Sequence, residues 1–394
     1  MKISYPAGVV KISNIFRRYG HSAYAVGGCV RDSVMGRTPY DWDMTTDASP
    51  ERMLEIFSSE GIKTIPTGLK HGTVTALLDG ESFEITTFRI DGGYTDSRHP
   101  DSVIFTRNLS DDLVRRDFTI NAMAADPSYK ENGTENEITD LFGGIDDINN
   151  KVIRAVGDPE RRFCEDALRI LRGVRFASTL GFTIEEETKF AAKKLGQKLE
   201  MVSVERKKTE LEKILLSDNA DMGISLLFEL DLAKYIHNEL KMPEIPLCSL
   251  PKCFETRISA MFGYEKVPSL ASMKLSNAES SRIKLLCNSS LYSDELSGEN
   301  ARRLISIFGD IAEDAALLHK NNALSELISL EREKNPCVRI SDLKISGGEL
   351  KDAGIEPRKI GRIMEILLSE VIKCPENNNR DTLLNIALDT EKII

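Results

Sequence analysis

Two aspartates separated by a single residue, Asp41 and Asp43, are the first side chains in this sequence that could do chemistry. Alternate residues of a strand point to the same face, so we expect the two carboxylates side by side and Trp42 on the opposite, apolar side. Like charges held together are costly unless a cation lies between them, and Mg²⁺ takes carboxylate oxygens together with the phosphate oxygens of a substrate. The pair therefore predicts a divalent-metal site for phosphoryl or nucleotidyl transfer. For an isolated D-x-D motif, a solvated strand edge or a helix N-cap is the alternative.

A phosphate-binding turn is expected just upstream, in the segment AVGGCVRD (Ala25–Asp32). A strand that ends in Gly27 and Gly28 and leads into a helix lets main-chain N–H groups approach a phosphate without an intervening Cβ. Arg31 would lie on the first turn of that helix, where its guanidinium could clamp a triphosphate. A Gly-Gly pair is also common in plain tight turns, and it is the nearby aspartate pair that favours phosphate binding.

A third carboxylate, Glu84, belongs to an alternating segment, Ser82–Ile90, that is typical of a strand. Phe83 and Ile85 would face one side of this strand and Glu84 the other. A neighbouring strand could bring Glu84 beside the aspartate pair, which would make it a third catalytic residue. An exposed strand position fits the pattern equally well.

The densest polar segment is RRDFTINAMA, residues 115–124. Arginine has the planar fork that suits phosphate, and asparagine can bind a ribose hydroxyl. Arg115, Arg116, Asp117 and Asn121 therefore predict contacts with a nucleotide. A structural cluster of salt bridges is the alternative.

The elements that must position these groups form a small α/β head followed by a long helical remainder. Asp79 and Gly80, between two alternating segments, predict a β-hairpin, and Pro-containing breaks near residues 243–251 and at Pro336 predict two boundaries further along. Strands are expected at residues 22–26, 40–45, 73–78 and 82–90, and helices at residues 6–20 and 51–60.

The composition is that of an ordinary globular chain of 394 residues, 41% of them hydrophobic. No apolar run approaches the roughly 20 residues that span a bilayer, the N-terminal segment lacks the pattern of a signal peptide, and seven scattered cysteines favour reduced thiols. We therefore expect a cytoplasmic protein with no membrane partner.

The net charge of -10 argues against nonspecific binding of nucleic acid over the whole surface of the protein. Residues 161–214, however, carry 13 basic and 9 acidic residues, so a polyanion is expected to bind there.

Four motifs combine into a recognisable pattern: GGCVRD followed by DWD, TGLKHGTVTA (67–76), EITTFR (84–89) and RRDFTINAMA. Together they resemble the class II tRNA nucleotidyltransferase and bacterial poly(A) polymerase family. The resemblance is close over the first 217 residues and returns weakly at residues 338–355. Each motif alone is common, but their combination is specific.

This resemblance implies an α+β nucleotidyltransferase head of mixed β-sheet and helices (1–150), followed by an all-α remainder. The remainder would comprise a neck with nucleotide-base recognition (151–217), a body that binds RNA (218–335) and a tail that binds tRNA (336–394). Asp41 and Asp43 would be the ligands of Mg²⁺. The nucleotide-binding residues that it implies are Gly27, Gly28, Arg31, Arg115, Arg116, Asp117, Asn121, Asp158, Asp166, Arg169, Arg172 and Arg175.

Asp166 and Arg169 match the family's E-D-x-x-R signature, which implies that they read the base. Three positions apart on an expected helix, they would share one face. Cytosine and adenine both present an amino donor beside a ring-nitrogen acceptor, so a carboxylate can accept while a guanidinium donates. Guanine and uracil would mismatch both contacts and leave buried groups unpaired, at about 1–3 kcal/mol each. Without the resemblance, a surface salt bridge would be the simpler explanation.

A segment rich in Gly, Asp and Ser, residues 89–105, predicts a mobile loop. CC-adding members of the family lack an acidic-basic element in this loop, and Asp96 and Arg98 resemble that element. We therefore expect addition of CCA to the 3′ end of tRNA from CTP and ATP, with release of pyrophosphate.

The alternatives are an A-adding enzyme, a poly(A) polymerase, a small-molecule nucleotidyltransferase and a catalytically silent RNA-binding protein. The oligomeric state, monomer or homodimer, is left open. His71, in the GLKHGT turn, is expected to be structural.

Overall fold

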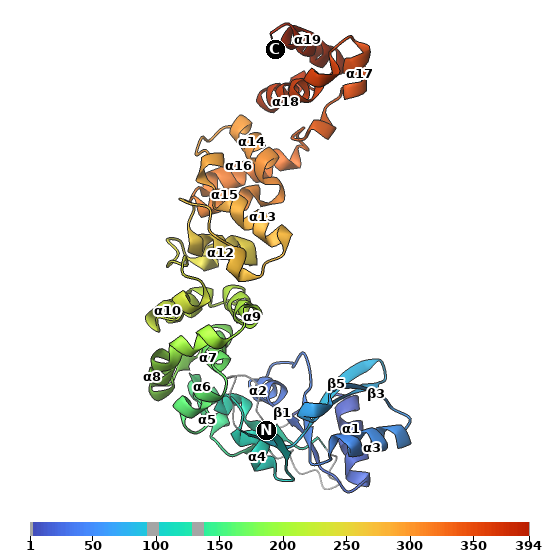
Figure 1. Cartoon of the computed structure of the whole chain (residues 1–394), viewed down its shortest axis with the longest axis vertical. Coiled ribbons are helices and arrows are strands. Elements are labelled where there is room, and N and C mark those ends of the chain that lie inside the picture. The colour runs from blue at the N-terminus through green and yellow to red at the C-terminus, as the bar shows by residue number, and fades with distance from the viewer. Residues whose placement is uncertain (1–2, 93–101, 128–137, 394) are drawn as a thin grey trace. The chain divides into compact units, whose positions relative to one another are not determined.

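The computed structural model describes residues 3–92, 102–127 and 138–393 (Figure 1). The chain divides into two compact units, residues 1–238 and 239–394. The finer division into head, neck, body and tail stays a prediction, and the predicted loop residues Asp96 and Arg98 lie outside the described residues.

The first unit contains a seven-stranded sheet with the strand order β3-β4-β5-β2-β1-β8-β9. Strands β2 and β5 are parallel, and the other neighbouring pairs are antiparallel. The mixed sheet predicted for the head is therefore confirmed. The strands are β1 (Ala23–Val26), β2 (Met44–Thr46), β3 (Lys63–Gly68), β4 (Thr73–Leu78), β5 (Glu81–Thr87), β8 (Met123–Ala125) and β9 (Ile138–Asp140).

The predicted hairpin joins β4 to β5, with Leu78 opposite Glu81. Asp79 and Gly80 have φ angles of 53° and 88°. Positive φ at both central residues is what a two-residue turn needs to match the twist of its strands, so the Asp-Gly pair explains where this connection forms.

Two helices, α1 (Ala7–Arg18) and α3 (Pro50–Ser59), share a core with the sheet and lie together beside β3 and β5 in Figure 1. Phe16 of α1 meets Phe57 of α3 edge to face, with ring centroids 5.4 Å apart. Ser49 begins α3 by accepting a hydrogen bond from the Arg52 N–H, as an N-cap serine does.

The predicted strand at residues 40–45 is shorter than expected, since β2 begins at Met44. Asp41 and Asp43 therefore precede the strand. The Asp43 carbonyl still accepts a hydrogen bond from the Val26 N–H at 3.0 Å, and the Trp42 ring packs on Tyr5 at 5.4 Å. Trp42 thus faces the core as predicted.

Two smaller strand pairs complete the first unit, and one of them corrects the prediction of an all-α segment after residue 150. Strands β10 and β11 are parallel, whereas β6 and β7 are antiparallel. The strands are β6 (Arg89–Asp91), β7 (Val103–Phe105), β10 (Val152–Ile153) and β11 (Thr183–Ile184). The remaining helices of this unit are α2 (Gly28–Val34), α4 (Leu109–Val114), α5 (Gly144–Asn150), α6 (Pro159–Glu165), α7 (Leu168–Leu180), α8 (Glu186–Leu195), α9 (Val204–Leu215), α10 (Ala220–Glu229) and α11 (Ala233–Ile236).

The second unit is helical throughout its described residues. Its last part has a core of its own, formed by residues of α17, α18 and α19. No helix among the described residues is long and apolar enough to cross a membrane. The helices are α12 (Phe254–Phe262), α13 (Asn277–Leu286), α14 (Gly298–Phe308), α15 (Ala312–Leu318), α16 (Asn322–Glu333), α17 (Gly347–Asp352), α18 (Pro357–Lys373) and α19 (Arg380–Glu391).

Candidate active site

Glu84, in the middle of β5, lies beside the aspartate that directly precedes β2. The parallel register pairs Met44 with Ile85, so Asp43 and Glu84, each one residue earlier, lie next to each other. Asp43 is open to solvent on one side, but partial burial and repulsion from Asp41 and Glu84 raise its pKa to about 6, although Arg116 acts in the opposite direction. The structure therefore brings Glu84 beside the aspartates, as one of the two interpretations expected.

The chemistry of these side chains fits a divalent cation. They offer hard carboxylate oxygens, and repulsion from Asp41 and Glu84 adds to burial in raising the pKa of Asp43. In the part of the chain that the structure describes, no three groups converge closely enough to form a complete metal site. This donor set fits an ion such as Mg²⁺, which keeps water and substrate phosphates among its ligands.

The glycine turn lies at the end of β1. Gly27 has φ 81° and ψ -127° and directly precedes α2. A Cβ on Gly27 would lie 2.9 Å from Arg116 Nη1, so glycine is required both for the backbone conformation and for the close approach of Arg116. The Gly27 N–H already donates to the Met123 carbonyl at 3.1 Å. Gly27 thus contributes the shape of the turn rather than the free donor that the sequence suggested.

A chain of hydrogen bonds joins α2, the RRDFTIN segment and α7. Arg31 Nη1 donates to Asn121 Oδ1 at 2.7 Å, Asn121 Nδ2 donates to Asp117 Oδ1 at 3.2 Å, and Arg172 Nε donates to Asp117 Oδ2 at 2.7 Å. Burial alone would raise the pKa of Asp117, but Arg172 outweighs it and holds this pKa at about 2. The structure therefore brings together four of the predicted nucleotide-binding residues.

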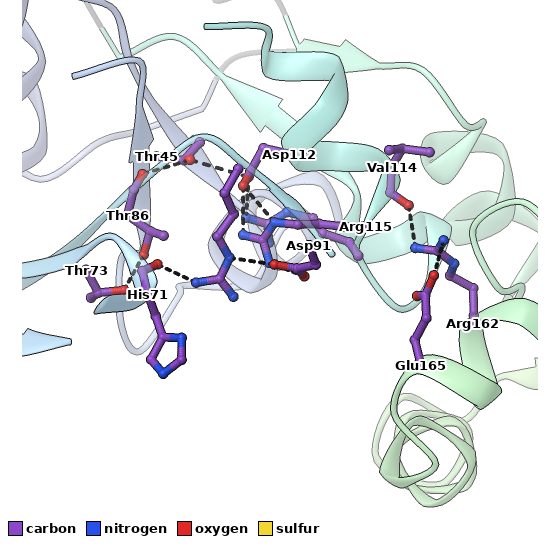
Figure 2. Close-up of polar contacts among 12 residues, drawn as sticks. Thr45, His71, Thr73, Thr86, Asp91, Asp112, Val114, Arg115, Arg162 and Glu165 are labelled. Carbon is purple, nitrogen blue, oxygen red and sulfur yellow. Dashed lines mark hydrogen bonds and ion pairs between the residues drawn. The ribbon is translucent and has the colours of Figure 1, made fainter. Parts of the chain in front are cut away.

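The arginines of the same segment are held by Asp112, a residue that the sequence analysis missed (Figure 2). The Asp112 carboxylate is fully buried and accepts hydrogen bonds from Arg115 Nη2 at 2.7 Å, Arg116 Nη2 at 3.3 Å and Thr45 Oγ1 at 3.3 Å. Burial would raise its pKa, but the two arginines hold it below its usual value. The signal was available in the sequence, because Asp112 precedes the arginines by three and four positions, the spacing of neighbours on a helix.

A second missed residue is Phe176 of α7. Its ring is contacted by three guanidinium groups, with Arg175 at 4.0 Å, Arg31 at 5.3 Å and Arg172 at 5.4 Å from the centroid. The ring also meets Phe118 edge to face at 5.8 Å. Cations are attracted to the face of an aromatic ring, so Phe176 helps to hold three predicted nucleotide ligands in one place.

The expectation that Asp166 shares a helix with Arg169 is wrong. Asp166 lies in the break between α6 and α7, with φ -141° and ψ 105°. Its Oδ1 accepts a hydrogen bond from the Leu168 N–H at 3.0 Å, and its Oδ2 accepts one from Arg206 Nη2 at 2.7 Å. An aspartate that bonds to nearby main chain competes with the helix in this way.

Arg169 lies in the first turn of α7 and is largely buried. Its Nη1 donates to Glu165 Oε2 at 2.7 Å and to the Arg162 carbonyl at 3.1 Å, and its Nη2 donates to the Arg115 carbonyl at 2.8 Å. In this structure both predicted base-reading residues are therefore oriented by protein partners, and neither is bonded to the other's side chain.

Asp158, a predicted nucleotide-binding residue, and its neighbour Arg162 have contacts typical of structural roles. Asp158 caps α6 by accepting hydrogen bonds from the N–H groups of Glu160 and Arg161. Arg162 is buried and donates to the Val114 carbonyl at 3.0 Å (Figure 2). The nucleotide-binding role of Asp158 stays a prediction.

His71 contributes its main-chain carbonyl to the head, where it accepts a hydrogen bond from Arg89 Nη1 (Figure 2). This contact ties the turn before β4 to β6. The structural role expected for this turn is compatible with that bond.

Two family models match parts of this chain. The family described as "Poly A polymerase head domain" matches residues 23–154, and the family described as "Probable RNA and SrmB- binding site of polymerase A" matches residues 181–242. These ranges contain the carboxylates, the RRDFTIN segment and α9.

Curated relatives extend the likeness to the whole chain. The CCA-adding enzyme of Lactobacillus helveticus is 47% identical over 215 residues, which cover 55% of this chain and 51% of that protein. In that alignment the chain spans about half the length of its relative. The CCA-adding enzyme of Ligilactobacillus salivarius is 35% identical over 392 residues, which cover 94% of this chain and 93% of that protein.

Among solved structures, the CCA-adding enzyme of Bacillus stearothermophilus in complex with CTP superimposes with a TM-score of 0.80 at 29% identity. The match covers 98% of this chain and 97% of that one. On the strength of near-complete coverage in both sequence and structure, the chain belongs to the family of CCA-adding enzymes, which are tRNA nucleotidyltransferases.

Proposed function

We propose that this protein adds CCA to the 3′ end of tRNA, using CTP and ATP and releasing pyrophosphate. The observation that carries the proposal is that acidic and basic side chains come together in the first unit. Asp41, Asp43 and Glu84 form an acidic group that a cation would neutralise, and Arg116 lies between this group and the glycine turn.

Asp41 and Asp43 would hold Mg²⁺ with Glu84 beside them. When bound, the ion lowers the pKa of the attacking hydroxyl and stabilises the charge that develops on the α-phosphate. Asp43 must be ionised for this role, and Arg116 favours its ionised form.

The arginines would bind and orient the triphosphate. Arg115 and Arg116 are held by Asp112, while Arg31, Arg172 and Arg175 gather around Phe176. Guanidinium groups bind phosphate oxygens in a fixed, bidentate geometry. Because their protein partners already orient them, little side-chain entropy would be lost when a nucleotide binds.

Asp166 and Arg169 would select the base. Asp166 would accept a hydrogen bond from the amino group that cytosine and adenine share, and Arg169 would donate to the adjacent ring nitrogen. Arg169 keeps its Nε and one Nη2 hydrogen outside the bonds described above, so it can donate without losing all its protein partners.

We propose the cytoplasm as the location of the protein, because the cysteines in the described part of the chain form no disulfides and this fits a reducing environment.

The deciding experiment supplies the purified protein with Mg²⁺ and a tRNA that lacks its 3′ CCA. CTP and ATP are offered separately and together, and the 3′ end is sequenced. We expect CC with CTP alone and CCA with both. Addition of A only to a tRNA that already ends in CC would identify an A-adding enzyme, a long A tail would identify a poly(A) polymerase, and no incorporation would contradict the proposal.

A further inference from the structure

Helix α9 packs against α7 and carries two charged residues on the side that faces it. Arg206 and Glu210 are four positions apart and therefore lie on one face of the helix. Glu210 is buried, with 5% of its surface exposed, and Arg206 is half-buried. Neither residue belongs to the motifs on which the proposed function rests.

Arg206 holds the carboxylate that is proposed to read the base. Arg206 Nη2 donates to Asp166 Oδ2 at 2.7 Å, and the Leu168 N–H donates to Oδ1 of the same carboxylate. With one contact on each oxygen, the plane of the carboxylate is fixed. Arg206 Nη1 is buried and has no hydrogen-bond partner among the described residues, and the side-chain hydrogen bond that the structure gives Arg206 is the one to Asp166.

Glu210 holds an arginine that is proposed to bind phosphate. Glu210 Oε2 lies 2.6 Å from Arg175 Nε, and the Arg175 guanidinium stacks on Phe176. The ion pair and the ring confine this guanidinium from two directions. A carboxylate at this place also offsets the charge of three neighbouring arginines around one ring.

We propose that α9 positions two different parts of the nucleotide site, with Arg206 setting base selection through Asp166 and Glu210 setting triphosphate affinity through Arg175. The inference rests on the proposed function and deepens it. Both are positioning residues, since they act through groups that touch the nucleotide. Their contacts differ in one respect that can be measured, because only Asp166 faces the part of the nucleotide that distinguishes C from U.

The test for Arg206 is Arg206→Gln, which keeps the length of the side chain and removes its charge. Asp166 then loses one of the two contacts that fix its direction. We expect the ratio of kcat/KM for CTP over UTP to fall by about tenfold or more, with a smaller change in kcat for CTP. Arg206→Lys keeps the charge and one donor, and should restore part of the selectivity.

The test for Glu210 is Glu210→Gln, measured on the same substrates. Arg175 keeps its ring contact but loses its carboxylate. We expect KM to rise about threefold to tenfold for both CTP and ATP, with the preference for CTP over UTP unchanged.

Lys213→Gln, an exposed residue of the same helix, is the matched control and should change neither quantity. Thermal unfolding of all variants separates positioning from folding, because a purely structural role would lower Tm without separating selectivity from affinity. The inference is overturned if Arg206→Gln and Glu210→Gln change selectivity and KM in the same proportions, or if neither variant differs from wild type. A wild-type protein that adds no nucleotide would instead refute the proposed function.

Discussion

The aspartates of this chain fall into two groups with opposite electrostatics. Asp43, near Asp41 and Glu84, has a pKa raised to about 6, whereas arginine partners hold the pKa of Asp117 at about 2. The two groups differ in exposure, since Asp41, Asp43 and Glu84 are exposed whereas Asp117 is buried. They also differ in their partners: the first group has mainly other carboxylates for neighbours, and the second has guanidinium groups.

The comparison distinguishes two parts of the site. The carboxylates around Asp43 would be completed by a bound cation, whereas Asp117 already has its partners within the protein. An acidic group whose repulsion is only partly offset, here by Arg116, can be relieved by an external cation. A carboxylate saturated by arginines instead fixes their geometry before any nucleotide arrives.

The largest effect is expected for Asp43→Asn. Losing a metal ligand should lower kcat by about 10³-fold or more, while the fold is kept, because the substitution removes repulsion rather than a bonded partner. CCA addition and thermal unfolding measure the two quantities. Asp79→Asn, in the exposed β4–β5 turn, should leave both nearly unchanged, and a marked loss of stability in Asp43→Asn would contradict the contrast.

Asp112→Asn should behave in the opposite way and lose stability together with activity. Breaking a buried ion pair from one side costs about 3 kcal/mol, since Arg115 and Arg116 would keep their charges without the carboxylate that offsets them. We expect a free energy of unfolding lower by about that amount and a rise of about tenfold in KM for CTP. Asp111→Asn is the control, because Asp111 bonds to Thr106 and Asn108 rather than to the arginines.

A smaller effect is expected for Phe176→Leu, which keeps an apolar side chain but removes the aromatic face. A cation–π contact contributes about 0.5–1 kcal/mol, so KM for CTP and for ATP should rise about threefold. Phe163→Leu removes a buried ring elsewhere in the same unit and controls for the loss of volume. Equal KM values in the two variants would show that the ring does not orient the arginines.

The smallest effect is a pH dependence of stability without metal. Because the pKa of Asp43 in the fold, about 6, lies above that of an unfolded aspartate, about 3.9, its ionisation destabilises the fold as the pH rises from about 4 through 6. In EDTA, the free energy of unfolding of Asp43→Asn should therefore increase relative to that of wild type over this pH range. Mg²⁺ should reduce the difference between the two proteins. For Asp117 the sign is reversed: its stabilising contribution is present above about pH 4 and lost as the pH falls towards 2. If the difference in free energy of unfolding between Asp43→Asn and wild type does not change with pH, the raised pKa of Asp43 is contradicted.

The local features of the fold could be predicted from the sequence. The Asp79-Gly80 turn and the helices at residues 6–20 and 51–60 follow from residue types and short-range spacing, and the structure confirms them. The inward direction of Trp42 was also predicted, although residues 41–43 precede the strand, and Glu84 needed the parallel register of β2 and β5 to settle its position.

Features made by contacts between distant segments could not be predicted. Asp166 and Arg169 were expected on one helix, but Asp166 lies in a break, where its carboxylate accepts hydrogen bonds from the Leu168 N–H and from Arg206, 40 positions away in the chain. The spacing of Asp112 to Arg115 and Arg116 could have identified it, but its contact with Thr45 depends on the tertiary fold. The residues that the sequence identified are those that would touch the nucleotide, and those that it missed hold them in place.

The hydrogen bond from Arg169 to the main-chain carbonyl of Arg115 has a consequence of its own. It ties the side chain that would sense the base to the backbone that carries the phosphate clamp. Arg169 cannot turn far without stretching this bond. With the proposed roles of these residues, a misplaced base would therefore disturb the backbone that carries the phosphate-binding arginines, and a substitution of Arg169 would change fidelity and turnover together.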